Sequence, residues 1–265
     1  MTAAPESEVR DPRRVISLLL VGVCGGLLSG AFGVGGGIIM VPLLMWFVGM
    51  DQRRAAATSL VAIVPSAIAG TIQYLAQGEV DVTAGLIVAL GGVAGSLVGT
   101  KLLRTLSLGW LRWLFIALLV LVAARLFFEV PSRDAQLAYT PGVVVALVGL
   151  GLVMGVASGL FGIGGGVILV PVLIAFFGLG DLLAKGTSLL AMIPTSITGS
   201  ASNLRAGMVR LSDGLIAGAA AVLASFGGVA LAFWLPPQLA VILFAAFILI
   251  VVAQLVIRAL RSPKS

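Results

Sequence analysis

The sequence predicts an all-α integral membrane protein. We expect two inverted repeats, each of about five apolar segments with a glycine-broken short or re-entrant helix. Three observations lead to this prediction. The 265 residues are 60% hydrophobic and only 10% charged, with a mean hydropathy of +1.20. A glycine-rich phrase that begins at Ser29 returns 129 residues later at Ser158, and each half contains an odd number of apolar segments.

The composition excludes a protein surrounded by water. Soluble globular domains carry about 25% charged residues, so this chain cannot cover a water-facing surface. Its long apolar segments are typical of helices and not of the alternating strands of an outer-membrane barrel. We therefore expect the lipid bilayer as its main partner. The formal net charge is +6, and the basic residues that produce it lie at the ends of the apolar segments. Lys and Arg at these positions set the orientation of a membrane protein, so the charge indicates no nucleic-acid partner.

The residue inventory also limits the chemistry of the protein. Histidine is absent and Cys24 is the only cysteine, which removes most soft-metal and Cys/His catalytic chemistry. We expect no metal site, no cofactor and no internal disulfide.

Ten apolar segments account for most of the chain, five in each half, and the halves align without a gap. In the first half they span 15–32, 38–49, 55–76, 82–103 and 108–128, and in the second 144–161, 167–178, 185–202, 211–235 and 239–257. The predicted organisation is a tail at 1–14, a first transmembrane repeat at 15–129, a linker at 130–143, a second transmembrane repeat at 144–258 and a tail at 259–265.

The second segment of each half is too short to cross a bilayer as a helix. A dozen residues at 1.5 Å each span roughly 18 Å, whereas the hydrocarbon core is ~30 Å thick. Each short segment is therefore a half-helix, a re-entrant arm or a steeply embedded helix, and the sequence leaves these forms open.

The odd number of segments places the two repeats in opposite orientations, and the positive charges support this. With the N-terminus inside, 13 of the 16 Lys and Arg residues fall on the inside face, and only Arg125, Arg133 and Lys185 fall outside. We expect a multi-pass protein of the cytoplasmic (inner) membrane with both termini cytoplasmic and an extracytoplasmic linker. Merging each broken segment into one crossing would place many basic residues outside.

The repeated phrase reads SGAFGVGGGIIMVPLL at 29–44 and SGLFGIGGGVILVPVL at 158–173. Mid-helix glycines are costly and freed backbone groups in lipid cost more, so such a break needs a reason. Successive glycine N–H groups can form an anion-binding concavity, and the positive end of the following half-helix points at the same place. Inverted repeats with broken helices are typical of secondary transporters. The candidate substrate-binding glycines are Gly33, Gly35, Gly36, Gly37, Gly162, Gly164, Gly165 and Gly166.

Close packing of helices is the alternative role for these glycines. Two other series with four-residue spacing, Gly91-Gly95-Gly99 and Gly151-Gly155-Gly159, are expected to serve packing alone.

A second phrase is also repeated, TSLVAIVPSAIAG at 58–70 and TSLLAMIPTSITG at 187–199. Its hydroxyl side chains could line the glycine breaks, or they could bond only their own helices. The further candidates for substrate binding are Thr58, Ser59, Ser66, Thr187, Ser188, Thr195 and Asn203.

No carboxylate falls in the middle of an apolar segment. Acidic residues such as Asp181 and Asp213 lie at segment ends, where we expect solvent to surround them. This argues against a cation relay and against acid–base catalysis within the membrane, so no catalytic residue is assigned. Arg53 and Arg205 are expected to anchor orientation, the alternative being that they concentrate anions at the inner mouth.

The two phrases together resemble the sulfite exporter TauE/SafE family of membrane proteins, and the resemblance covers both halves. It implies transport of a small sulfur-containing anion, such as sulfite or an organosulfonate, across the cytoplasmic membrane. Thr195 and Thr198 stand where the first copy has Ser66 and Ala69, so the two sites need not be equivalent.

We expect a secondary transporter that binds this anion near the midplane. A channel-like anion facilitator and a non-transporting membrane scaffold remain alternatives, and an enzyme is not expected. The sequence does not fix which anion is carried, the direction of transport, a coupling ion or the oligomeric state.

Overall fold

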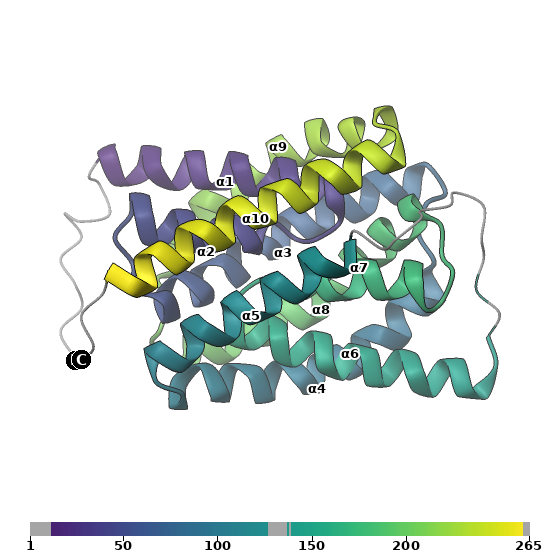
Figure 1. Ribbon diagram of the computed structural model, residues 1–265, viewed down its shortest axis with the longest axis horizontal. Helices are drawn as coiled ribbons and strands as arrows, with labels where there is room; N and C mark the ends of the chain where they lie inside the picture. The colour runs from purple at the N-terminus through teal and green to yellow at the C-terminus, as the bar shows by residue number, and fades with distance from the viewer. Residues whose placement is uncertain (1–11, 127–136, 138, 262–265) are drawn as a thin grey trace.

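The computed structural model describes residues 12–126, 137 and 139–261, and every regular element in that part is a helix (Figure 1). Its helices are α1 Pro12–Phe32, α2 Gly37–Phe47, α3 Gln52–Ala76, α4 Val82–Thr105, α5 Leu108–Leu126, α6 Pro141–Phe161, α7 Gly166–Ala175, α8 Asp181–Arg205, α9 Leu211–Trp234 and α10 Pro237–Arg261.

Every helix of the first half begins 129 residues before its counterpart in the second half. The correspondence also holds at the far ends of three pairs, because α1 and α6, α3 and α8, and α4 and α9 have equal lengths. Several boundaries differ from the predicted ones; α1 begins at Pro12 and α10 ends at Arg261, each inside a predicted tail. Helix α6 begins at Pro141, inside the predicted linker, because Thr140 caps it by accepting a bond from the N–H of Val143. Helix α8 extends beyond the predicted 185–202 at both ends.

Glycine faces join helices from different halves. An added Cβ at Gly91, Gly95 or Gly99 of α4 would lie 2.0–2.2 Å from backbone oxygens of α6, and the α6 glycines meet α4 in the same way. The packing role of these two glycine series is thereby confirmed. Helices α1 and α9 repeat this arrangement, with Gly22 against Ala217 and Gly26 against Ala221. Two closely packed parallel pairs therefore each contain one helix from each half.

The two short helices fold back along the helices that precede them. A Cβ added at Gly25 of α1 would lie 2.3 Å from the Cε of Met40 on α2, although the chain turns between them at residues 33–36. At the second break, a Cβ added to Gly165, the N-cap of α7, would lie 2.4 Å from the Cγ of Met154 on α6. Each short helix thus returns toward the end of the molecule from which its predecessor came.

Helices α3 and α8 cross at the centre in antiparallel directions, since Gly70 meets Leu189 and Gly199 meets Leu60. Five helices of the described part are long and apolar enough to span a membrane, namely α1, α3, α4, α6 and α9. In Figure 1, α1 begins and α10 ends at the left side of the molecule, whereas α6 begins at the right side and α5 runs from the left toward it.

The expectation that Asp181 and Asp213 are solvated is wrong. Asp181 is 3% exposed and pairs with Lys185, which is 5% exposed, at 3.3 Å. Asp213 is 2% exposed and lies 2.6 Å from Arg14, joining the beginnings of α9 and α1. Helix packing removes both carboxylates from water. A basic side chain pairs with each of them and neutralises its charge.

Candidate functional site

Two breaks in the helical backbone occupy equivalent positions. The first separates α1 from α2 at residues 33–36, and the second separates α6 from α7 at residues 162–165. Gly33, Gly35 and Gly36 have φ values of 67°, 76° and 71°, and their counterparts Gly162, Gly164 and Gly165 have 71°, 76° and 90°. Only glycine adopts such φ values without strain, which explains why both copies of the phrase keep glycine at these positions.

The two breaks face each other in the interior. A Cβ added at Gly37 would lie 2.2 Å from the carbonyl oxygen of Gly162, and one at Gly166 would lie 2.5 Å from that of Gly33. All residues from 33 to 38 and from 162 to 167 are buried. The fold therefore brings the eight predicted glycines to one place.

A serine from each central helix reaches the break of the other half. Ser59 of α3 donates a hydrogen bond to the carbonyl oxygen of Gly162 at 2.6 Å, and Ser188 of α8 donates to that of Gly33 at 2.9 Å. These bonds engage two carbonyl oxygens whose partial negative charge would otherwise face the space between the breaks.

The glycine breaks contain several backbone N–H groups that have no hydrogen-bond acceptor among the described residues. Among the described residues, no acceptor meets the N–H groups of residues 34–38 or 163–167. The N-cap residues of α2 and α7 are Gly36 and Gly165, and neither provides a side-chain cap. Buried backbone donors without partners are rare in folded proteins. Two clusters of such donors, each at the positive end of a helix, make this region suited to an anion.

Two apolar side chains fill the space between the breaks. The Cε atom of Met192 lies 1.8 Å from the position of a Cβ on Gly35 and 2.1 Å from that of a Cβ on Gly164. The side chain of Ile63 lies within 3.3–3.5 Å of the same two positions. Met192 and Ile63 are equivalent residues of α8 and α3, and the sequence analysis missed both because each looked like an ordinary core residue.

Four other predicted residues make contacts elsewhere. Thr58 Oγ1 lies 3.7 Å from the Sδ of Met50. Thr187 accepts a hydrogen bond from the N–H of Asp81 at 2.9 Å. The hydroxyls of Ser66 and Thr195 donate to carbonyls of their own helices at 3.0 and 2.8 Å. The alternative role, bonding to the same helix, thus describes Ser66 and Thr195.

Asn203 and the serines that precede the two breaks are buried, and their side chains have no hydrogen-bond partner among the residues that the structure describes. Both amide atoms of Asn203 lack a partner, and so do the hydroxyls of Ser29 and Ser158, which precede the breaks by one helical turn. Burial of an unpaired polar group is costly, so these positions are suited to a ligand or ordered water. The sequence analysis did not assign the two serines, although both lie within the repeated phrase.

The two breaks also differ in their surroundings. Gly33 packs against the backbone of Lys185, whereas its counterpart Gly162 packs against Ala56. Among the described residues, a buried ion pair therefore lies beside the first break and not beside the second.

The chain is similar to known membrane proteins over most of its length. A family model described as Sulfite exporter TauE/SafE matches residues 2–126 and 147–265. The probable membrane transporter protein YunE of Bacillus subtilis (strain 168) is 28% identical over 217 residues, covering 73% of this chain and 80% of that protein. A probable membrane transporter protein of Xylella fastidiosa (strain 9a5c) is 34% identical over 177 residues, covering 65% and 66%. No solved structure matches the chain significantly.

Proposed function

The chain belongs to the sulfite exporter TauE/SafE family, and from this premise we propose that it is a secondary transporter for a small sulfur-containing anion. The anion binds between the two glycine breaks, near the middle of the membrane. The family and the relatives named as membrane transporters support membrane transport. The family description also motivates the choice of sulfite or an organosulfonate as cargo.

The unpartnered amides of the breaks carry this proposal. An oxyanion presents several acceptor atoms, and the N–H groups of residues 34–38 and 163–167 are donors that find no acceptor in the described part of the chain. The positive ends of α2 and α7 add to the attraction for negative charge. Ser59 and Ser188 contribute by holding the two inward carbonyl oxygens, which would repel an anion.

The filled centre favours a carrier over a channel-like facilitator. Met192 and Ile63 occupy the space that an anion would have to cross, so passage requires a rearrangement. Methionine is flexible and can repack around a ligand. A carrier predicts stimulation of uptake by substrate on the opposite side of the membrane, whereas a channel does not.

We further propose that the two repeats are inverted in the cytoplasmic membrane with both termini cytoplasmic. The opposite running directions of equivalent helices in Figure 1 support the inversion, and the distribution of Lys and Arg supports the orientation. Such an arrangement places the binding region at the interface between repeats, as in other secondary transporters.

Alanine at the breaks tests the proposed site. Gly35→Ala and Gly164→Ala are the suitable variants, because the added Cβ meets the flexible end of Met192. Gly36 is unsuitable, since a Cβ there would lie 2.2 Å from the carbonyl oxygen of Gly25. We expect both variants to bind sulfite or ethanesulfonate at least about tenfold more weakly, a loss of about 1.4 kcal/mol. Affinity and melting temperature are measured on the same purified samples.

Two glycines provide controls. Gly78 has the same φ of 76° with no atom within 4 Å of an added Cβ, so Gly78→Ala isolates the backbone strain. Gly95→Ala isolates packing, since its Cβ would lie 2.2 Å from the carbonyl oxygen of Leu152. Normal affinity with a lowered melting temperature in Gly35→Ala and Gly164→Ala would show that the breaks are packing devices.

A further inference from the structure

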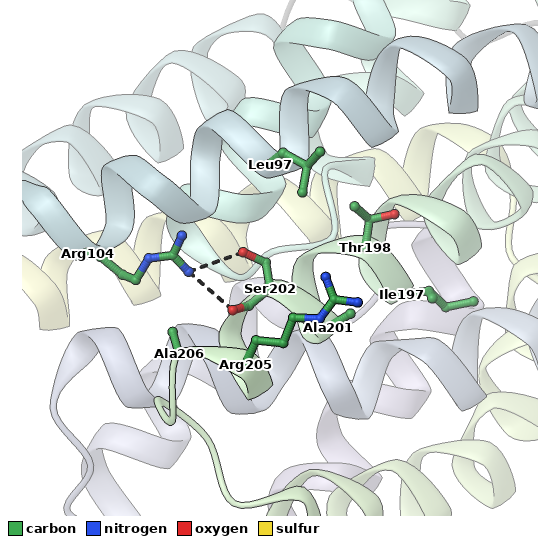
Figure 2. A pocket seen from close by; sticks show the side chains of 8 residues that line it. All are labelled: Leu97, Arg104, Ile197, Thr198, Ala201, Ser202, Arg205 and Ala206. Atoms are coloured by element: carbon green, nitrogen blue, oxygen red, sulfur yellow. Dashed lines mark hydrogen bonds between the residues drawn. The ribbon is translucent and has the colours of Figure 1, made fainter.

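A groove of about 560 Å³ opens between the ends of α4 and α8 (Figure 2). It lies at the end of the molecule where α1 begins and α10 ends, because α4 and α8 both finish there. We call it the Arg104–Arg205 groove, and it is lined by Leu97, Arg104, Ile197, Thr198, Ala201, Ser202, Arg205 and Ala206.

The two arginines of the groove lack acidic partners. Neither Arg104 nor Arg205 makes an ion pair with any described residue. Elsewhere, Arg14 is neutralised by Asp213 and Lys185 by Asp181. The groove therefore concentrates positive charge from two helices with no carboxylate paired to it among the described residues, which favours a bound anion.

One guanidinium is held in place and keeps donors available. Figure 2 shows Arg104 reaching from α4 to Ser202 on α8, where its Nη1 lies 3.1 Å from the hydroxyl and 3.3 Å from the carbonyl oxygen. The hydroxyl of Thr100 lies 2.9 Å from that of Ser202 and fixes its position. Within the described part of the chain, Nη1 is the only nitrogen of Arg104 with a partner, so the other N–H groups of the guanidinium remain suited to an oxyanion.

The other half of the molecule shows that the fold does not require this groove. The residues equivalent to Arg104 and Arg205 are Phe233 and Ala76. There, the ring of Phe233 packs against Tyr74 with a centroid distance of 5.6 Å. The two arginines therefore occur at one end of the molecule only among these equivalent positions, and the packing of the helices does not require them.

We propose that the Arg104–Arg205 groove is an oxyanion subsite at the mouth of the transport path. It takes a sulfite or sulfonate group, or the chemically similar phosphate of an anionic phospholipid head group. Leu97 and Ile197, which are 51% and 48% exposed, provide an apolar wall for the attached alkyl chain. The substrate form of the inference rests on the proposed function, whereas the lipid form does not.

Transport and lipid binding are measured separately on Arg205→Gln and on Arg104→Gln/Arg205→Gln. Arg205 makes no side-chain hydrogen bond or ion pair with any described residue, so its single variant keeps the test interpretable if the double variant is unstable. In liposomes of phosphatidylcholine alone, ethanesulfonate uptake is assayed from the side of the groove. Native mass spectrometry counts phosphatidylglycerol retained by the detergent-purified protein. Arg54→Gln is the control, because Arg54 is an exposed arginine paired with Asp51 outside the groove.

If the groove receives the substrate, the double variant needs about tenfold more ethanesulfonate for half-maximal uptake, with little change in the maximal rate and a weaker dependence on salt. If the groove receives a lipid, the double variant loses retained phosphatidylglycerol while its uptake is unchanged. Unchanged uptake together with unchanged lipid retention overturns the inference. Loss of ethanesulfonate binding in Gly35→Ala tests the proposed function independently. If no anion is transported by the native protein, lipid retention alone decides the groove.

Discussion

Ser59 of α3 donates a 2.6 Å hydrogen bond to the carbonyl oxygen of Gly162, which belongs to the other half of the chain. Its counterpart Ser188 returns the same bond to Gly33 at 2.9 Å. Each half therefore holds the glycine break of the other half. The shape of the candidate site depends on the interface between the halves and not on either half alone.

Loss of either hydroxyl should affect both folding and binding. Ser59→Ala and Ser188→Ala each leave a buried carbonyl oxygen without its partner, which costs about 1–3 kcal/mol. We expect a lower melting temperature and weaker binding of sulfite or ethanesulfonate in both variants. Ser66→Ala is the control, since that hydroxyl bonds only its own helix. Equal behaviour of all three variants would argue against a role of the cross-repeat bonds.

Labelling of two equivalent residues tests the inverted topology. Gln77 follows α3 and Ala206 follows α8, and both are exposed. In a Cys24→Ala background, a membrane-impermeant thiol reagent should label Gln77→Cys in intact cells. Ala206→Cys should react only after the cells are permeabilised. Labelling of both, or of Ala206→Cys alone, in intact cells would contradict the proposed orientation.

The buried ion pair beside the first break should be sensitive to loss of its acid. Asp181→Asn removes the carboxylate that lies 3.3 Å from the buried ammonium of Lys185, and breaking a buried ion pair costs about 3–5 kcal/mol. Asp51→Asn is the matched control at the start of the equivalent helix, where the pair with Arg54 is exposed and is worth about 0–1 kcal/mol. Thermal denaturation measures the melting temperatures of both variants. If Asp181→Asn lowers the melting temperature no more than Asp51→Asn does, burial does not increase the contribution of the Asp181–Lys185 pair to stability.

Shortening the side chain between the breaks should change substrate selection. Met192→Ala removes the atoms that fill the space beside Gly35 and Gly164. We expect lower stability, by about 2–5 kcal/mol, together with relatively faster transport of longer alkylsulfonates. Met192→Leu keeps most of the volume and should resemble the native protein. Uptake rates for a series of alkylsulfonates provide the measurement. An unchanged preference in Met192→Ala would exclude this residue from the substrate path.

Much of the helical framework could be predicted because apolar periodicity and the repeated phrase both lie in local sequence. The packing role of Gly91, Gly95 and Gly99 was predictable for the same reason, since four-residue spacing places small residues on one helix face. The burial of Asp181 was not predictable, because it depends on which helix covers the beginning of α8.

The candidate site was predictable only in part. The glycines were identified because helix-breaking residues in an apolar segment require an explanation. Met192 and Ile63 were missed because apolar residues carry no local signal of lying between two distant breaks. Thr58 and Thr187 aligned as well as Ser59 and Ser188 did, yet adjacent helix positions face different neighbours. Only the crossing of α3 and α8 decides which hydroxyl meets a break.

The pairing of α1 with α9 and of α4 with α6 also sets an order of events during biosynthesis. The ribosome completes α4 before α6, and α1 long before α9, so the glycine faces of α1 and α4 enter the bilayer without the helices that later cover them. The first half therefore cannot reach its final packing until translation of the second half is nearly complete. Because each half carries the matching faces for the other, two separately expressed halves should assemble into the native arrangement when they meet in one membrane.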